Sequence, residues 1–140
     1  MIFKSFEIKK INLNINKLLL FYGKNEGLKY EAIEILNKDK SNISNYEEKE
    51  VLDNENNFIE TILSKSLFDP QKFIIIKRAT DKILKIIENL QHDNLEDTTI
   101  ILNSESLEKK SKLRSFFEKN KTLVCVPFYP DNDQTLSKLA

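Results

Sequence analysis

Four short runs of this chain are apolar or begin with a threonine that is followed only by apolar residues, and longer segments with apolar residues at helical spacing separate them. The runs are residues 18–22, 73–76, 99–102 and 122–126. A run of four or five apolar residues without alternation is typical of a strand that is covered on both faces. Because strands that alternate with helices form βαβ units, the sequence predicts an α/β fold, a three-layer parallel sheet of about five strands with flanking helices.

The segments between these runs predict helices by their apolar spacing. Leu28, Ala32, Ile35 and Leu36 indicate a helix that ends at about Asp39. Further helices are expected over residues 58–63, 83–90 with Thr80 as N-cap, 113–117, and from residue 131 onward.

Two parts of the chain carry weaker patterns. Residues 1–16 alternate isoleucine or leucine with asparagine near their end, which predicts a half-exposed strand or an extended lead-in. Residues 49–52 are a short strand candidate that would supply the fifth strand, and residues 53–57 are expected to form a loop.

Composition limits the possible functions. The chain has 140 residues, enough for one domain with its own core, and 22 basic residues balance 22 acidic ones. Zero net charge does not support broad electrostatic capture of nucleic acid or of a membrane surface. No apolar stretch approaches the ~18 residues of a membrane span, and the single cysteine, Cys125, is expected to be buried in a strand. We therefore expect a cytoplasmic protein with no membrane partner.

The loop after the first predicted strand has the position of a phosphate-binding loop but not its residues. Gly23 and Gly27 are four apart rather than five, and Gly27 is followed by Leu28 and Lys29 rather than by lysine and a hydroxyl residue. The strand 73–76 ends in Lys77-Arg78, where a magnesium-holding or phosphoacceptor aspartate would stand. These residues argue against nucleotide hydrolysis and against a receiver domain, so we expect no cofactor.

Other polar residues are interpreted as solvent-exposed. His92 has no second histidine or cysteine nearby, so a metal site has no ligand set. Lys77-Arg78 could contact phosphate, although a solvated strand end is the preferred interpretation. Lys112 and Arg114, with Lys109-Lys110 before them, are interpreted as the wet face of a helix.

Leu67 and Phe68 stand where a helical pattern stops and an Asp-Pro turn signal follows. On a helical wheel of about 100° per residue, one apolar stripe contains Phe58, Ile59, Ile62 and Leu63. Leu67 lies roughly 110° and Phe68 roughly 150° from the centre of that stripe. Two alternatives stay open. Either the helix continues and the pair points outward as an anchor for a partner, or the helix ends earlier and both side chains tuck under the turn.

The order of these elements, with several local strings, resembles the N-terminal domain of the delta subunit of bacterial DNA polymerase III, part of the sliding-clamp loader. The strings are Leu19-Leu20-Phe21-Tyr22-Gly23 with Leu28 and Glu31-Ala32, then Ser66-Leu67-Phe68, Lys109-Lys110-Ser111-Lys112-Leu113, and Val126-Pro127-Phe128. No string is stringent alone, and their order and spacing carry the resemblance, which covers essentially the whole chain.

The resemblance implies an ATPase-associated (AAA+), P-loop-NTPase-like fold with a degenerate nucleotide loop and no catalysis by this chain. It implies that Leu67 and Phe68, preceded by Ser66, insert into a hydrophobic pocket of the ring-shaped sliding clamp (the beta subunit) and help to open it for loading during DNA replication. Clamp-binding segments often carry glutamine three residues before the serine, and this chain has Leu63 there.

The resemblance also implies the surroundings of the domain. Residues 1–140 would be a single N-terminal clamp-binding domain, a fragment of a longer three-domain subunit of bacterial DNA polymerase III. The other clamp-loader subunits would bind through regions outside this sequence, and DNA contact would be indirect or local. The alternative hypothesis is an ATP-binding AAA+ domain with an aberrant loop in which Lys24 contacts phosphate. A third is a scaffold in which Phe68 is buried.

Overall fold

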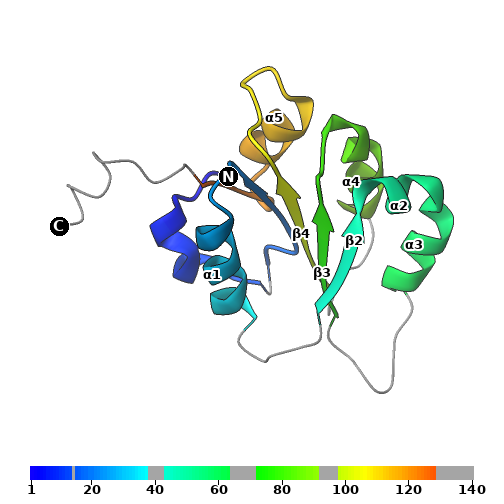
Figure 1. Ribbon diagram of the computed structural model, residues 1–140, viewed down its shortest axis with the longest axis horizontal. Helices are drawn as coiled ribbons and strands as arrows, with labels where there is room; N and C mark the ends of the chain where they lie inside the picture. The colour runs from blue at the N-terminus through cyan, green and yellow to red at the C-terminus, as the bar shows by residue number, and fades with distance from the viewer. Residues whose placement is uncertain (14, 38–42, 64–71, 92–97, 129–140) are drawn as a thin grey trace.

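Five parallel strands form one sheet in the order β2-β3-β4-β1-β5 (Figure 1). The computed structural model describes residues 1–13, 15–37, 43–63, 72–91 and 98–128. The strands are β1 (Leu18–Tyr22), β2 (Ile43–Glu47), β3 (Lys72–Lys77), β4 (Thr98–Ser104) and β5 (Val124–Pro127). The predicted α/β fold with its parallel sheet is confirmed.

Helices cover both faces of this sheet, and the chain order explains which helix lies on which face. The helical elements are η1 (Ser5–Lys10), α1 (Glu26–Leu36), α2 (Glu48–Asp53), α3 (Glu55–Leu63), η2 (Asp81–Ile83), α4 (Leu84–Gln91) and α5 (Lys112–Lys119). From β1 the chain crosses to the far edge at β2 and then returns strand by strand. Because crossovers between parallel strands are right-handed, α1 lies on one face and α2 to α5 on the other.

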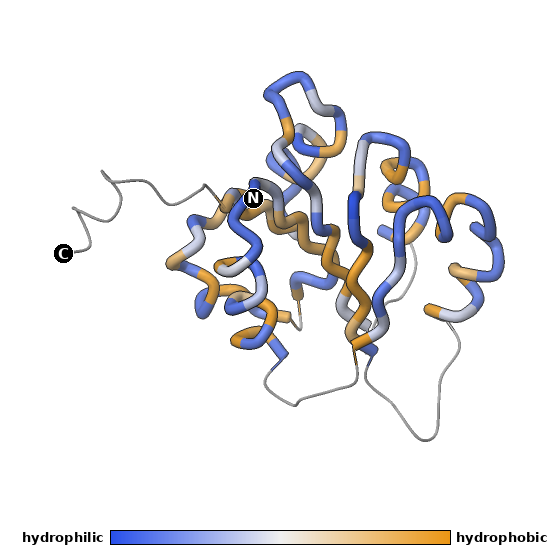
Figure 2. Tube along the Cα trace, in the orientation of Figure 1, coloured by the Kyte–Doolittle hydropathy of each residue, from blue (hydrophilic) through white to orange (hydrophobic). Residues whose placement is uncertain are grey.

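The core divides into two layers that meet the two faces of the sheet. Along β1, Leu18, Leu20 and Tyr22 pack with residues of α2 to α5, while Leu19 and Phe21 pack with residues of η1 and α1. All five residues of β1 are buried, and the central strands appear as an apolar band in Figure 2. The continuous apolar runs are therefore strands covered on both faces, as predicted.

The predicted strand at residues 49–52 is wrong, because these residues lie in α2. The Glu50 carboxylate accepts a hydrogen bond from the Glu47 backbone N–H at 3.3 Å, which satisfies a donor at the start of this helix. Val51 is buried against the core and Leu52 half-buried. The edge strand is β2, which directly precedes α2 in the chain, and its mostly exposed side chains explain why no apolar run marked it. The loop expected at residues 53–57 is reduced to Asn54, since α3 begins at Glu55.

The N-terminal segment also differs from the expected half-exposed strand or extended lead-in. Residues 5–10 form η1, whose Ile8 is buried against the α1 layer. Among the described residues before β1, Ile2 alone forms a β-bridge, to Cys125 of β5. Thr80 is confirmed as an N-cap: its hydroxyl accepts from the Lys82 backbone N–H at 3.3 Å at the start of η2, which runs into α4.

Within the described ranges, no helix is long and apolar enough to cross a bilayer.

Candidate functional site

Two regions of the fold are candidate sites: the segment that carries Leu67 and Phe68, and the carboxyl edge of the sheet. Residues 64–71, and with them Ser66, Leu67 and Phe68, lie outside the described residues, as do His92 and residues 131–140. The helix before the segment is described. On α3, Phe58 and Ile62 are buried and Ile59 is half-buried, as its spacing predicts.

At the carboxyl edge, the turn after β1 is packed by protein backbone. Gly23 has a φ of 115°, a conformation that side chains other than glycine rarely adopt. Its N–H donates to the Glu105 carbonyl at 3.2 Å, and the Phe128 N–H donates to the Tyr22 carbonyl at 2.7 Å. A Cβ atom at position 23 would lie 1.9 Å from the Phe128 carbonyl oxygen. The chain after β5 therefore fills the space directly beside this turn.

The N-terminus of α1, where a phosphate would bind in a phosphate-binding loop, is satisfied by the protein itself. The Asn25 side-chain oxygen accepts from the Leu28 backbone N–H at 3.1 Å and so caps the helix. Glu26 adds a carboxylate in the first turn. This negative charge interacts favourably with the positive end of the helix dipole and would repel a phosphate. Lys24, the phosphate ligand of the alternative hypothesis, is exposed.

Lys29 is the buried cation of this edge, with only 1% of the residue exposed. Its Nζ donates to Ser104 O at 2.7 Å, to Asn103 Oδ1 at 2.8 Å and to Glu26 Oε1 at 3.1 Å. The ammonium group has three protons, and these three oxygens can accept all of them. The side chain therefore ties α1 to the carboxyl end of β4 and is committed to protein partners.

Sequence reasoning passed over Lys29 because it placed the apolar face of α1 about one residue away from its true position. Ile33 is buried, whereas Ile35 is 37% exposed. The buried positions Ala32, Ile33 and Leu36 lie three, four and seven residues after Lys29, which is the spacing of one helix face. A lysine on that stripe, three residues after a glutamate, was the signal that could have found it.

The end of β3 carries two exposed cations, as expected for the solvated strand end that the sequence analysis preferred. Lys77 and Arg78 are exposed, and Arg78 Nε lies 3.7 Å from Glu47 Oε2. Magnesium is bound through oxygen ligands, and this strand end supplies none from side chains. Across the part of the chain that the structure describes, no group of three or more histidine, cysteine or acidic residues is placed to hold a metal ion.

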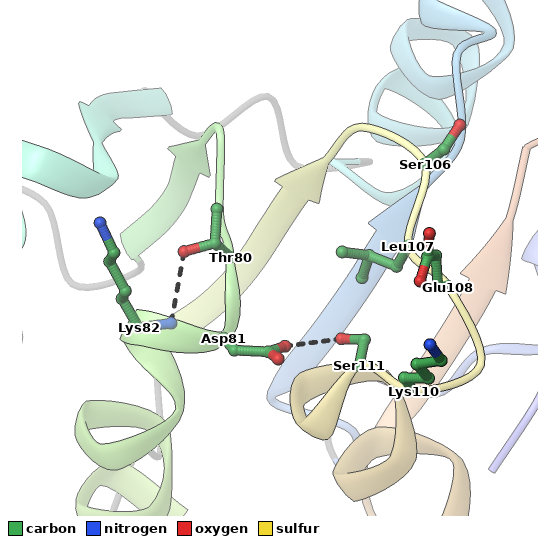
Figure 3. A pocket seen from close by; sticks show the side chains of 8 residues that line it. All are labelled: Thr80, Asp81, Lys82, Ser106, Leu107, Glu108, Lys110 and Ser111. Atoms are coloured by element: carbon green, nitrogen blue, oxygen red, sulfur yellow. Dashed lines mark hydrogen bonds between the residues drawn. The ribbon is translucent and has the colours of Figure 1, made fainter.

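A cavity of about 430 Å³ opens between η2 and the loop that leads into α5, lined by Thr80, Asp81, Lys82, Ser106, Leu107, Glu108, Lys110 and Ser111 (Figure 3). Asp81 fills the N-terminus of α5: its carboxylate accepts from Ser111 Oγ at 2.6 Å, Leu113 N at 3.1 Å and Lys112 N at 3.2 Å. The Ser111 hydrogen bond, with the two backbone donors, lowers the pKa of Asp81. This acidic group therefore has a structural role as a second cap of α5.

Replacing Asp81 with asparagine is expected to lower the free energy of unfolding by about 1–2 kcal/mol at pH 7. Because the pKa of Asp81 is lower in the folded chain than its unfolded value of about 3.9, the stabilisation is present above that pH. It is lost as the pH falls through the folded pKa. Urea unfolding of both chains at pH 7 and near pH 3 measures this. A stability difference that stays constant between the two pH values would contradict the assignment.

Arg114 and Cys125 lie close to the β1–β5 side of the sheet, and the structure tests what the sequence predicted for each. Arg114 was expected on a wet helix face but is half-buried: it donates to Leu107 O at 3.0 Å and to Glu118 Oε2 at 3.3 Å. Its guanidinium lies 5.0 Å from the centre of the Tyr22 ring, an attractive cation–π geometry.

Cys125 is buried in β5 as predicted, and burial raises the pKa of its thiol to about 12. Such a thiol is not a nucleophile at neutral pH.

Comparison with known proteins bears on the fold. No family model matches the sequence, and no curated protein matches it. A solved structure, the Bacillus subtilis DNA clamp loader delta protein (YqeN), matches over 96% of this chain with a TM-score of 0.67 and 15% sequence identity. The chain spans 44% of the length of that protein. The chain is thus similar in fold to part of a clamp loader delta protein.

Proposed function

We propose that this chain is a non-catalytic, delta-like clamp-loader domain that binds the sliding clamp and helps to open it. Leu67 and Phe68 are the anchor residues, with Ser66 preceding them. Residues 1–140 act as the N-terminal clamp-binding domain of a longer subunit in the DNA polymerase III machinery of a bacterial cytoplasm. The other loader subunits bind through regions outside this sequence, and any contact with DNA is local.

The observation that carries the proposal is a clamp-loader delta fold whose phosphate-loop region is occupied by its own side chains. The fold likeness extends over 96% of the chain. The Lys29 ammonium group donates its three hydrogen bonds to protein oxygens, and the Asn25 side chain caps α1. A domain with this fold, whose described side chains Asn25 and Lys29 are bonded to protein atoms in the phosphate-loop region, fits a binding role better than ATP turnover.

The mechanism we propose is the insertion of a hydrophobic plug. Aromatic and aliphatic anchors that fill a pocket commonly contribute ~2 kcal/mol or more each to binding. Binding shifts a conformational equilibrium only by the difference in affinity for its two states. Opening of the clamp therefore requires that Leu67 and Phe68 fit the pocket better when the neighbouring clamp interface is open.

Titration calorimetry with two ligands tests this proposal against the alternative. The chain is titrated with the purified sliding clamp of its own organism and, separately, with ATP and magnesium. We expect saturable binding of the clamp and no heat from ATP at micromolar concentrations. Micromolar ATP binding that is lost in Lys24→Met, with no binding of the clamp, would instead establish the ATP-binding alternative.

A further inference from the structure

The two edge strands of the sheet differ in whether their outer side is paired. Beside β5, the Phe3 N–H donates to the Cys125 carbonyl at 3.0 Å, and the Cys125 N–H donates to the Met1 carbonyl at 2.9 Å. β2 forms the other edge (Figure 1), and the backbone of its residues 43–46 has, within the described ranges, no hydrogen bond except those to β3. The outer N–H and C=O groups of β2 can therefore pair with another extended chain.

β2 also lacks the residues with which proteins commonly protect an exposed edge. Lysine and proline are typical guards of such a strand, and neither occurs in Ile43–Glu47. Its one charged residue, Glu47, stands at the end of the strand. The residues Ile43, Ser44 and Asn45 are exposed, so the outer edge is accessible along most of its length.

Cavities lie on both faces of the sheet beside this edge. On the α1 face, a cavity of about 600 Å³ is lined by Ile43 and Asn45 of β2, Ile75 of β3 and Ile33 of α1, among others. On the other face, a cavity of about 120 Å³ is lined by Tyr46 and by residues of α2 and α3. Because the side chains of a strand alternate between faces, a strand added beside β2 would direct its side chains toward both cavities in turn.

The charge around the edge is acidic, although the whole chain is neutral. Residues 43–63 form β2, α2 and α3 and hold one basic residue, Lys49, against six acidic ones: Glu47, Glu48, Glu50, Asp53, Glu55 and Glu60. Glu48 is buried and accepts hydrogen bonds from Thr80, whereas the other five carboxylates are at least partly exposed. Charge complementarity therefore favours a basic partner at this edge.

The larger cavity suits the side chain of such a partner. Ile33, Ile43 and Ile75 give it an apolar wall, and Glu34 lies in the same lining on α1. Lysine and arginine combine an apolar stem with a charged head. One long basic side chain can therefore contact the isoleucines with its stem and Glu34 with its head.

We propose that the outer edge of β2 is a docking site for an extended basic segment of a partner protein. The segment pairs with β2 as a further strand of the sheet, and its main chain forms the hydrogen bonds that give affinity. Its alternate side chains enter the cavity between α1 and β2, and its positive charges face the acidic residues of α2 and α3. The site is separate from the proposed clamp anchor.

Synthetic peptides test the site. The probe is a fluorescein-labelled peptide that alternates lysine and valine and is longer than β2 by one residue at each end. One matched control has glutamate in place of every lysine. A second has a methyl group on every backbone nitrogen, which keeps the charges and removes the N–H donors. Binding to the full chain is measured by fluorescence anisotropy at physiological salt, and NMR shifts of the backbone amides locate the bound peptide.

Variants of Ser44 test the edge from the side of the chain, because this side chain is exposed on β2. Ser44→Lys adds a cation at the edge and Ser44→Glu adds an anion at the same position. Ser106→Lys is the matched control, since Ser106 is exposed in the loop after β4, and β3 separates β4 from β2. Urea unfolding of each variant checks that the fold is retained.

We expect saturable binding of the lysine–valine peptide, with the largest amide shifts in Ile43–Glu47. The glutamate peptide loses the charge attraction and the methylated peptide loses the main-chain hydrogen bonds, so both should bind at least about tenfold more weakly. Across paired strands, opposite charges attract and like charges repel. Ser44→Lys should therefore weaken binding roughly threefold or more, Ser44→Glu should not weaken it, and Ser106→Lys should match the unchanged chain.

The proposal is overturned if the methylated peptide binds as tightly as its parent, since binding would then depend on charge alone. It is also overturned if the lysine–valine peptide does not bind, or if the largest shifts lie away from β2 and the cavity beside it. Analytical ultracentrifugation covers the remaining occupant: a dimer that Ser44→Lys dissociates would place a second copy of the chain at this edge, against the proposal.

Discussion

Replacing Gly23 with alanine is expected to destabilise the folded chain by at least about 3 kcal/mol. Two costs add. The φ of 115° is strained for any residue with a Cβ, and the new Cβ would lie 1.9 Å from the Phe128 carbonyl oxygen and 2.7 Å from the carbonyl carbon. Both atoms are backbone, held by the Phe128 N–H to Tyr22 O hydrogen bond, so relief requires β1 and the end of β5 to separate.

Gly27 provides the matched control for this substitution. It lies in the first turn of α1 with no positive φ, and a Cβ there would meet its nearest atom, Asn25 Oδ1, at 3.7 Å. Gly27→Ala should therefore be neutral or stabilising by up to about 1 kcal/mol. Urea unfolding of the three chains is the measurement. If Gly23→Ala unfolds at the same midpoint as Gly27→Ala, the packed turn described above is wrong.

Phe68→Ala is expected to weaken clamp binding by roughly 30-fold or more, which corresponds to a loss of about 2 kcal/mol. The expected change in the free energy of unfolding is small, because an outward-facing ring contributes little to the domain's own core. If the ring is instead packed inside its own domain, the same substitution removes core contacts and costs about 3–5 kcal/mol of stability. Leu67→Ala should follow the same pattern with a smaller loss.

The parts of the fold that could be predicted are those in which burial on both faces dictates the sequence. Leu18–Tyr22 and the core of β3 can be read from apolar runs, because strands covered on both faces are built mostly of apolar residues. The N-cap at Thr80 could be read as well, since a hydroxyl before a helix serves a definite backbone donor.

The misplaced elements are those whose sequence signal is set by tertiary context. β2 is an edge strand with exposed Ile43, Ser44 and Asn45, so it has neither a continuous apolar run nor a clean alternation. Val51-Leu52 is a short apolar pair that fits a strand or a helix equally well, and the packing of α2 decides between them. In the candidate site, Glu26 is a local partner of Lys29, but its other two partners, Asn103 and Ser104, lie on β4, more than 70 residues away in sequence. No local pattern encodes those two.

Clamp titration with the unchanged chain, Phe68→Ala and Phe6→Ala tests the central claim most directly. Phe6 is a matched control because it is an aromatic residue with 80% exposure, on η1 at the opposite face of the sheet from α3. The account predicts tight binding by the unchanged chain and Phe6→Ala, and loss of at least about 30-fold in Phe68→Ala, with similar urea midpoints for all three. Equal clamp affinity for Phe68→Ala and Phe6→Ala would contradict it.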